Sequence, residues 1–288
     1  MRVGIVGSNG YIANHLNDSF SKLQDVDEII MIGRTEKADL LLDLLKPEIF
    51  DYSALQGLDM IFYTAAMSGP DQCAQKYDEC WGINVEGTSY FIRNAINCNC
   101  KVIFFSSDAV YGDNGDVTST ENSDLRGNTP YGKMKIEVEK TFSTEDMFKA
   151  LRLPYVVSEN DKFMSYCLSC LRQGKEAEIF HPFYRNCITI TQLMNVSIWF
   201  LKNYDRYTPK SLNVAGDELV SRIRIADELN RIVNNRFKYV IDSPGEDFFT
   251  NRPRITQISS EYLYKYGILK RMSFSEAFYD EMKGIKYE

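Results

Sequence analysis

Short apolar runs alternate with amphipathic segments along most of the chain. The runs have the length of buried strands, and the segments between them carry apolar side chains at helical spacing, as at Ile12, Leu16 and Phe20. Strands that alternate with helices in this way predict an α/β protein with a doubly wound parallel sheet. We expect strands at residues 2–6, 28–32, 40–44, 60–64, 101–105, 149–153 and 211–215, and well-marked helices at residues 11–23, 84–97 and 131–141.

The alternation weakens beyond Pro154, and no internal repeat or Gly/Ser-rich linker marks a boundary there. A second domain should therefore be formed by excursions from the main one. With 288 residues and 44% apolar content, the chain is long enough for one large α/β domain, or for a nucleotide-binding domain with a smaller appendage.

Charge and hydropathy limit the expected partners. The net charge of −7 argues against nucleic-acid binding, because nucleic-acid binders usually carry a basic surface. No apolar run reaches the roughly 20 residues that span a bilayer, so we expect no membrane partner. The N-terminus MRVGIVG resembles a strand and lacks the features of a signal peptide, and a cytoplasmic location follows as the default expectation.

Seven cysteines and two histidines suggest neither disulfides nor a metal site. An odd cysteine count without a secretion signal favours reduced thiols. Cys167 and Cys170 form a CxxC, but they lie in the apolar run FMSYCLSCL, which favours a helical core or an interface. A structural zinc site needs four ligands, so we predict no metal.

A glycine-rich segment follows the first predicted strand. It has the pattern GxxGxxA, ending at Ala13, and it opens a helix. Glycines let backbone amides approach a pyrophosphate at the positive end of the helix, although a plain structural turn has the same pattern. We predict a dinucleotide phosphate site formed by Gly7, Ser8, Asn9, Gly10, Tyr11 and Ile12.

The second predicted strand ends in MIGRT, with no carboxylate to hold a ribose diol. Arg34 would pair with a 2′-phosphate, which favours NADP(H); NAD(H) remains possible, and the alternative for Arg34 is an exposed turn arginine. Asp43 would accept a hydrogen bond from the adenine amino group or cap a helix.

Three side chains suited to carbonyl chemistry occur in one stretch. FFSSDAVYG contains Ser107, and TPYGKMK contains Tyr131 and Lys135. The last two are four residues apart, so on a helix they share one face, where the ammonium would lower the phenol pKa. Ser107 would orient a substrate oxygen. On spacing alone, a solvated helix face is the simpler interpretation.

Taken in order, these motifs resemble the extended short-chain dehydrogenase/reductase family, the NAD-dependent epimerase/dehydratase group that acts on nucleotide sugars. The resemblance runs through GSNGYIA, DMIFYTAA, INVEGT, FFSSDAVYG, YGKMK and ALRLPYVVS. It implies a Rossmann-like domain at residues 1–157, rejoined by 186–220, and a discontinuous α/β substrate domain at 158–185 and 221–288. It also implies Ser–Tyr–Lys catalysis and further cofactor contacts at Leu44, Ala65, Ala66, Asn84, Lys135 and Leu153.

The chain departs from the family pattern at three positions, none of which removes a catalytic atom. Ala13 replaces the third glycine, Met134 replaces the serine that often precedes the lysine, and Ser158 replaces the glycine after the sixth strand. The last change leaves the geometry of the substrate-side loop open.

The residues after Ser107 distinguish reactions within the family. Sugar 4,6-dehydratases resemble one another in having Asp then Glu there; this chain has Asp108 but Ala109, and so lacks one acid/base group for dehydration. An Asp alone is similar to dTDP-4-dehydrorhamnose reductase-like enzymes. Asp108 is therefore either a substrate-side catalytic group or a carboxylate that caps a loop.

Two arginines resemble the substrate-diphosphate ligands of the family. Arg185 lies in YRNCITI and Arg252 in NRP, and a planar guanidinium suits bidentate phosphate contact. Each is otherwise a structural arginine.

The leading hypothesis is NADPH-dependent reduction of a keto group on a nucleotide-linked deoxysugar. The alternatives are an NAD-dependent nucleotide-sugar 4-epimerase and a non-catalytic NADP-binding regulatory relative. The resemblance also implies a homodimer, formed through a four-helix bundle of the segments near 84–97 and 131–141.

Overall fold

The centre of the molecule is a seven-stranded sheet in which all neighbouring strands run parallel. The structure is a computed structural model that describes residues 1–287. The strand order β11-β6-β5-β4-β1-β2-β3 is that of a doubly wound, Rossmann-like sheet, as the sequence predicts. The strands are β1 (Arg2–Val6), β2 (Glu28–Gly33), β3 (Leu40–Leu41), β4 (Met60–Tyr63), β5 (Lys101–Ser107), β6 (Phe148–Leu153) and β11 (Ser211–Asn213).

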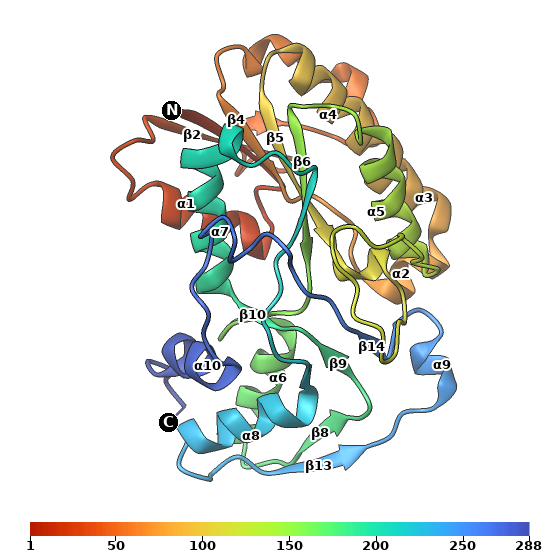
Figure 1. Cartoon of the computed structure of the whole chain (residues 1–288), viewed down its shortest axis with the longest axis vertical. Coiled ribbons are helices and arrows are strands. Elements are labelled where there is room, and N and C mark those ends of the chain that lie inside the picture. Colours follow the sequence, from red (N-terminus) through yellow and green to blue (C-terminus); the bar gives the residue numbers. More distant parts are fainter. Residues whose placement is uncertain (288) are drawn as a thin grey trace.

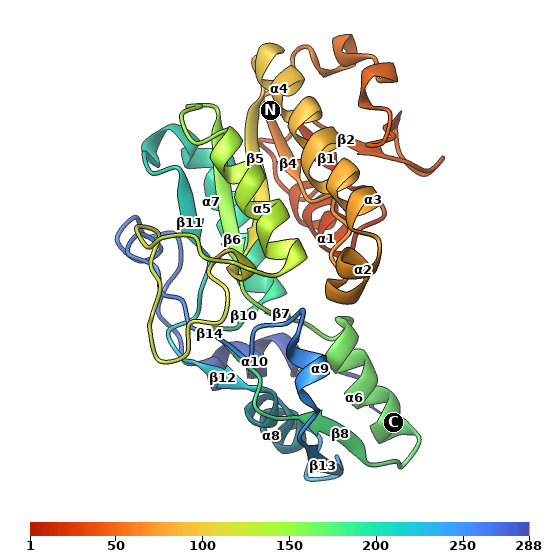
Figure 2. The ribbon, with the colours of Figure 1, turned by 90° about the vertical axis from the view of Figure 1, so that its right-hand side faces the viewer.

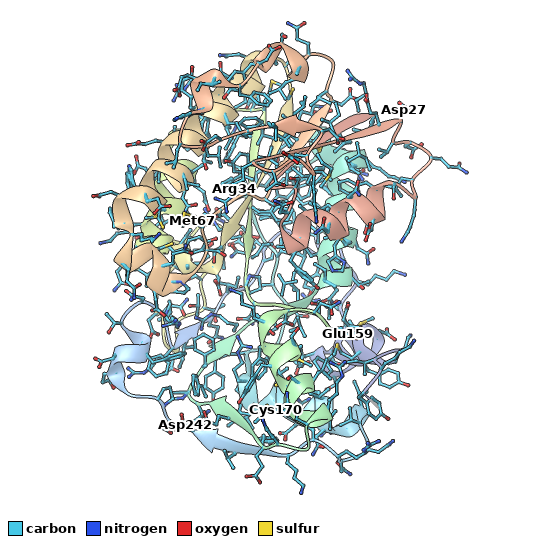
Figure 3. All side chains as sticks on the ribbon, turned by 180° about the vertical axis from the view of Figure 1, so that it is seen from behind. Asp27, Arg34, Met67, Glu159, Cys170 and Asp242 are labelled. Atoms are coloured by element: carbon cyan, nitrogen blue, oxygen red, sulfur yellow. The ribbon has the colours of Figure 1, made fainter. Side chains whose placement is uncertain are left out.

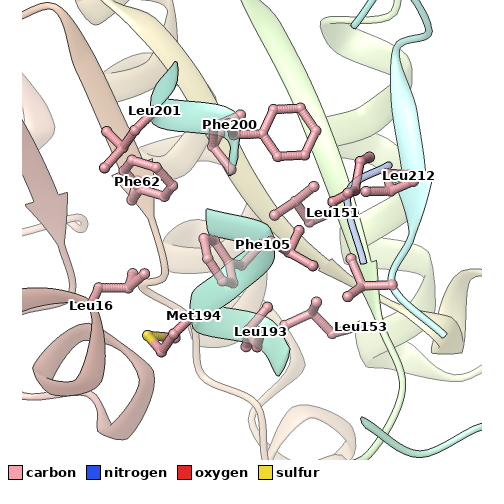
Figure 4. Packing of buried hydrophobic residues seen from close by; sticks show 14 of the residues in the cluster. Leu16, Phe62, Phe105, Leu151, Leu153, Leu193, Met194, Phe200, Leu201 and Leu212 are labelled. Carbon is pink, nitrogen blue, oxygen red and sulfur yellow. The ribbon is translucent and has the colours of Figure 1, made fainter. Parts of the chain in front are cut away.

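Helices cover both faces of this sheet (Figure 1). On one face, Leu16 of α1 (Tyr11–Phe20) and Met194 of α7 (Ile190–Asn203) belong to the same buried cluster as Phe105 of β5 (Figure 4). Because parallel strands are buried on both sides, they appear in the sequence as continuous apolar runs.

On the other face, the sheet is covered by α4 (Thr88–Asn97) and α5 (Pro130–Thr141). Phe91 of α4 and Val138 of α5 share a buried cluster with Phe104 of β5. The predicted helix at 84–97 begins as a π-helix, η3 (Gly82–Gly87), which follows α2 (Pro70–Gln75) and α3 (Tyr77–Trp81).

Strand ends differ from prediction where a side chain turns the backbone. The third strand ends at Leu41 and not at residue 44, because Asp43 lies in a turn where its Oδ1 accepts a hydrogen bond from the Leu45 amide at 3.0 Å. Conversely, β5 extends to Ser107, paired with Leu153 of β6, so the serine predicted to be catalytic ends the strand.

The remaining elements form a smaller lobe, here called the small lobe, below the sheet (Figure 2). Cys167 and Leu168 of its first helix pack with Leu229 and Phe278 in a separate buried cluster, which confirms that the CxxC lies in a helical core. The small lobe contains α6 (Lys162–Arg172), β8 (Ala177–Phe180), β9 (Tyr184–Arg185), β12 (Val220–Ser221), α8 (Arg222–Ile232), β13 (Tyr239–Asp242), α9 (Glu246–Phe249), β14 (Ile255–Thr256) and α10 (Phe274–Met282).

Two short strands and four 3₁₀ helices complete the elements described here. A two-stranded parallel pair joins β7 and β10 where the chain leaves and re-enters the sheet region. None of the helices within residues 1–287 has the length and apolar character that a membrane-spanning helix requires. The short elements are β7 (Val156–Val157), β10 (Ile188–Thr189), and the 3₁₀ helices η1 (Pro47–Ile49), η2 (Tyr52–Leu55), η4 (Asp108–Val110) and η5 (Tyr204–Arg206).

Candidate active site

The predicted catalytic residues gather at the carboxyl end of β5, the edge where open α/β sheets bind ligands. Ser107 ends β5 and caps η4, and its Oγ accepts a hydrogen bond from the Ala109 amide at 3.2 Å. The first turn of α5, which carries Tyr131, packs directly against η4.

A close backbone approach fixes that packing. A Cβ at Gly132 would lie 2.5 Å from the Ala109 carbonyl oxygen, so only glycine lets α5 come this near to η4. Pro130 occupies the first turn, and the Thr129 side chain caps the helix by accepting from the Gly132 amide at 3.2 Å. Tyr131 is therefore held at the start of a capped helix that packs on η4, the short helix that Ser107 caps.

Lys135 is almost fully buried behind Tyr131. Its Nζ donates to the Phe105 carbonyl oxygen at 2.7 Å and lies 5.6 Å from the centre of the Tyr131 ring. Burial lowers the pKa of the Lys135 ammonium to about 7.

The sequence suggests that Lys135 lowers the pKa of Tyr131, but the structure raises it. Burial raises the pKa of the phenol above its usual value, and the charges of Cys73 and Asp108 act in the same direction. The physical reason is that the lysine is itself desolvated and directed toward a backbone carbonyl. The structure thus holds Tyr131 as a protonated phenol, that is, as an acid.

Asp108 is buried and paired with Arg185. The Ser107 hydroxyl donates to Asp108 Oδ1 at 3.0 Å, and Arg185 Nε lies 3.2 Å from Oδ2. Oδ2 is buried without a hydrogen-bond partner, and burial raises the pKa of Asp108 despite the Arg185 charge. The carboxylate contacts the Ser107 hydroxyl, as its position in the sequence suggests.

Arg185 and Arg252 both form hydrogen bonds and ion pairs with other residues of the protein. Arg185 donates to the carbonyl oxygens of Tyr184 at 2.6 Å and Pro253 at 2.7 Å. Arg252 Nη1 donates to Asp71 Oδ1 at 2.9 Å, and Nη2 pairs with the other carboxylate oxygen. Asp71 lies on α2 and Arg252 in the small lobe, so this ion pair joins the two parts of the molecule.

The glycine-rich segment has the geometry expected of a dinucleotide site. Gly7 has φ of +103°, and a Cβ there would lie 2.8 Å from Thr64 Oγ1 and 2.9 Å from the Ala65 amide nitrogen. Ser8 Oγ is buried without a hydrogen-bond partner. The tight turn at Gly7 and the unpaired Ser8 hydroxyl lie just before the N-terminus of α1, where a pyrophosphate would bind.

A cavity of about 900 Å³ lies beside this segment. Arg34 is exposed at its edge, and the Asn9 amide donates to Thr35 Oγ1 at 2.8 Å. Figure 3 shows Arg34 and Met67 on the sheet side of the molecule, away from Cys170 of the small lobe. Lys37 also lines the cavity, a second cation that sequence reasoning missed although it lies three residues after Arg34.

The other predicted cofactor residues are distributed around the same strand ends. Asn84 sits in the π-helix, where its side chain donates to the Met67 carbonyl and accepts from the Met67 amide, both at 2.8 Å. A Cβ at Gly87 would collide with the Leu44 carbonyl, so the loop of Asp43 and Leu44 packs on this helix. Partly exposed Ala65 and Ala66 follow β4, Tyr11 and Ile12 begin α1 beside Gly10, and Leu153 ends β6.

Ser158, which stands where the family has a glycine, makes contacts that connect the two lobes. Its Oγ contacts the Tyr11 hydroxyl of the glycine-rich segment and accepts from the Asp161 amide at 3.1 Å. Asp161 caps α6 and accepts from the Ser158 amide at 2.9 Å. The sequence signal for this cap was available, because an aspartate stands directly before an apolar run of helical spacing.

Comparison with known proteins identifies the class that this fold and site define. A model of the NAD dependent epimerase/dehydratase family matches residues 3–215. The chain therefore belongs to this family, in agreement with the resemblance of its motifs.

Individual relatives within the family catalyse different reactions. The UDP-glucose 4-epimerase of Halalkalibacterium halodurans is 25% identical over 156 residues, which are 49% of this chain and 45% of that relative. The match thus spans less than half of the relative's length.

Solved structures share the fold over nearly the whole chain. The dTDP-4-dehydrorhamnose reductase of Bacillus anthracis, solved with NADP, has a TM-score of 0.80 at 18% identity and covers 97% of this chain and 98% of its own. MoeE5, solved with UDP-glucuronic acid and NAD, has a TM-score of 0.81 at 18% identity, with 96% of each chain covered. The fold is common to reductases and epimerases of nucleotide sugars.

Proposed function

We propose that this protein reduces a keto group on a nucleotide-activated deoxysugar, with NADPH as the reductant. The observation that carries the proposal is the chemistry beside Ser107. Asp108 is buried and paired with Arg185, and position 109 is alanine, so the second acid/base group of a dehydratase is absent. A simple reduction needs only one proton donor at the carbonyl oxygen.

Tyr131, Ser107 and Lys135 have different roles in the reduction of the carbonyl group. Bound NADPH would supply the hydride that the carbonyl carbon gains. Tyr131 gives its phenolic proton to the carbonyl oxygen, and its raised pKa keeps that proton on the phenol until the oxygen gains negative charge. On substrate binding, the Ser107 hydroxyl would turn its single proton from Asp108 Oδ1 to the same oxygen as negative charge develops on it. Lys135 is expected to hold the nicotinamide ribose and to return a proton to Tyr131.

The cofactor would be held by the glycine-rich segment and the cavity beside it. Gly7 and Gly10 allow the pyrophosphate to approach the backbone, and Ser8 offers an unpaired hydroxyl. Arg34 and Lys37 line the cavity together with one carboxylate, Glu36, and the remaining positive charge supports a preference for the 2′-phosphate of NADP(H).

Arg34→Ala tests this preference. We expect wild-type protein to use NADPH at least 10-fold more efficiently than NADH, and the variant to lose most of that ratio, since a charge-assisted contact to phosphate contributes about 1.5–3 kcal/mol. The measurement is kcat/KM for each cofactor. Equal use of both cofactors by the wild type would contradict the preference.

A nucleotide-sugar 4-epimerase is the second candidate. The sequence match to a UDP-glucose 4-epimerase supports it, and the Ser–Tyr–Lys set serves both reactions. An epimerase would retain tightly bound NAD and return the hydride to the same carbon, with no net use of cofactor.

Cofactor turnover separates the two candidates. We would incubate purified protein with NADPH and a panel of nucleotide-linked 4-keto-6-deoxysugars, and follow NADPH loss together with the sugar product. We expect NADPH consumption that matches product formation. Interconversion of two nucleotide sugars without cofactor consumption would favour the epimerase.

A further inference from the structure

Arg222, the first residue of α8, is held between aromatic rings of the small lobe. Its guanidinium carbon lies 4.1 Å from the ring centre of Tyr155 and 4.0 Å from that of Phe163, with Phe183 at 5.5 Å. The Arg222 amide donates to the Phe183 carbonyl at 3.3 Å and fixes the start of the helix. Two rings in contact with one guanidinium restrict its plane and leave its edge to bind a ligand.

Arg222 has no ionic partner among residues 1–287 of the chain. Its Nη1 is buried without a hydrogen-bond acceptor, a state that costs free energy unless a ligand supplies one. The two arginines that resemble the family's phosphate ligands are in the opposite situation. Arg185 donates to backbone carbonyls and pairs with Asp108, and Arg252 pairs with Asp71.

Side-chain contacts link Arg222 to the glycine-rich segment that is expected to hold the cofactor. Tyr155 contacts the Asp161 carboxylate through its hydroxyl, and Asp161 holds Ser158, which touches Tyr11 of the glycine-rich segment. A chain of direct contacts therefore connects Arg222 to the cofactor loop.

Arg222 also lies beside Arg185. Strand β12, which leads into α8, pairs with β9 so that Val220 stands opposite Arg185. The charge of Arg222 contributes to lowering the pKa of Arg185, after the larger effect of burial. Asp108 pairs with Arg185 and leaves the charge of Arg222 uncompensated, and this local excess of positive charge suits an anion.

We propose that Arg222 binds the diphosphate of the nucleotide-sugar substrate. This inference rests on the proposed function and adds to it a residue that the sequence did not indicate. The aromatic rings pre-orient the guanidinium, so little side-chain freedom is lost on binding. Arg185 then acts mainly as the partner of Asp108, and Arg252 as the partner of Asp71.

Calorimetric binding of UDP, dTDP, GDP, CDP and inorganic pyrophosphate tests this assignment. The variants are Arg222→Met, whose flexible apolar side chain fits between the two rings, and Arg222→Lys, which keeps the charge but loses the planar fork. Arg231→Met is the matched control, because it removes a cation from the last turn of the same helix, where the side chain is 64% exposed and pairs with Glu228. NADPH affinity, measured in parallel, reports whether each variant is folded.

We expect Arg222→Met to bind the nucleoside diphosphate about 10-fold or more weakly than wild type. Arg222→Lys should show a smaller loss of affinity, and Arg231→Met should bind like wild type. NADPH affinity should stay within about twofold in all three, since a difference below about 0.5 kcal/mol is typical of changes away from a site.

Two results would overturn the assignment of Arg222, and only the second would also contradict the proposed function. In the first, Arg222→Met binds the nucleoside diphosphate as tightly as wild type does, while Arg252→Met binds it more weakly. Arg252 would then be the diphosphate ligand, and the proposed function would stand. No binding of any nucleoside diphosphate by folded, NADPH-binding wild type would contradict the nucleotide-sugar function itself.

Discussion

At the scale of single residues, burial decides the protonation of the two central groups. Tyr131 stays protonated because its phenolate would be desolvated, and Lys135 is easily neutralised for the same reason. The spacing of the two residues was evident from the sequence. Their pKa values were not, because burial depends on η4 and β5, which come from elsewhere in the chain.

Tyr131→Phe removes only the phenolic hydroxyl, which is the proposed proton donor. We expect turnover to fall by about 10²–10⁴-fold, the usual value of a positioned acid, with NADPH binding retained. Steady-state kinetics and cofactor titration measure the two effects. Tyr279→Phe, at an exposed position of α10, serves as the control and should behave as wild type. A Tyr131→Phe protein with normal turnover would remove Tyr131 from the mechanism.

Lys135 should make the stability depend on pH. Its pKa is about 7 in the folded protein against 10.5 for an ordinary lysine, so between those values the unfolded chain binds more protons than the folded one. The free energy of unfolding should therefore rise with pH across that window, relative to a Lys135→Met variant without the group. Urea denaturation of both proteins at several pH values measures the difference. A constant difference would show that Lys135 keeps an ordinary pKa.

At the scale of elements, periodicity predicted most strands and helices, and the exceptions have local causes. The strands β1, β4 and β6 lie close to the predicted positions, because a buried parallel strand is a continuous apolar run. The end of β3 was missed because Asp43 forms a turn with Leu45. The roles of Arg185 and Arg252 could not be predicted, since their partners Asp108 and Asp71 are distant in sequence.

Gly132→Ala tests the contact between α5 and η4. In an ordinary helix this change stabilises by about 1 kcal/mol. Here the new Cβ meets the Ala109 carbonyl at 2.5 Å, so we expect destabilisation of about 1–3 kcal/mol, together with lower turnover as Tyr131 shifts from Ser107.

The control for that variant is Gly284→Ala. Gly284 is exposed, its φ lies outside the left-handed region and no atom lies within 4 Å of an added Cβ, so the free energy of unfolding should change by no more than about 0.5 kcal/mol. Equal urea midpoints for Gly132→Ala and wild type would mean that α5 can move away from η4 without cost.

At the scale of the whole molecule, we propose that the two lobes and a second copy of the chain make up the working unit. The separate buried cluster of the small lobe supports our proposal that residues 158–185 and 221–288 form the substrate domain. We also propose a homodimer through α4 and α5, which contact each other on one face of the sheet. Tyr90 of α4 is 44% exposed on that surface, while Lys135 is buried on the inner side of α5.

Tyr90→Asp tests the dimer. An added carboxylate that must be desolvated in an interface is costly, so we expect wild type to run at twice the mass of one chain and the variant to shift toward the monomer. Light scattering after size-exclusion chromatography measures both masses, and Tyr279→Asp on α10 controls for the added charge. A monomeric wild-type protein would rule out the bundle.

Isotope transfer tests the central claim, reduction by NADPH, most directly. Purified protein would be given NADPH deuterated at the transferred position of the nicotinamide, together with the nucleotide-linked keto sugar that it consumes. The proposed reductase places one deuterium on the former carbonyl carbon of the product for each NADPH oxidised. Products formed without deuterium, while the labelled NADPH remains unchanged, would contradict the reductase and indicate an internal hydride return by tightly bound cofactor.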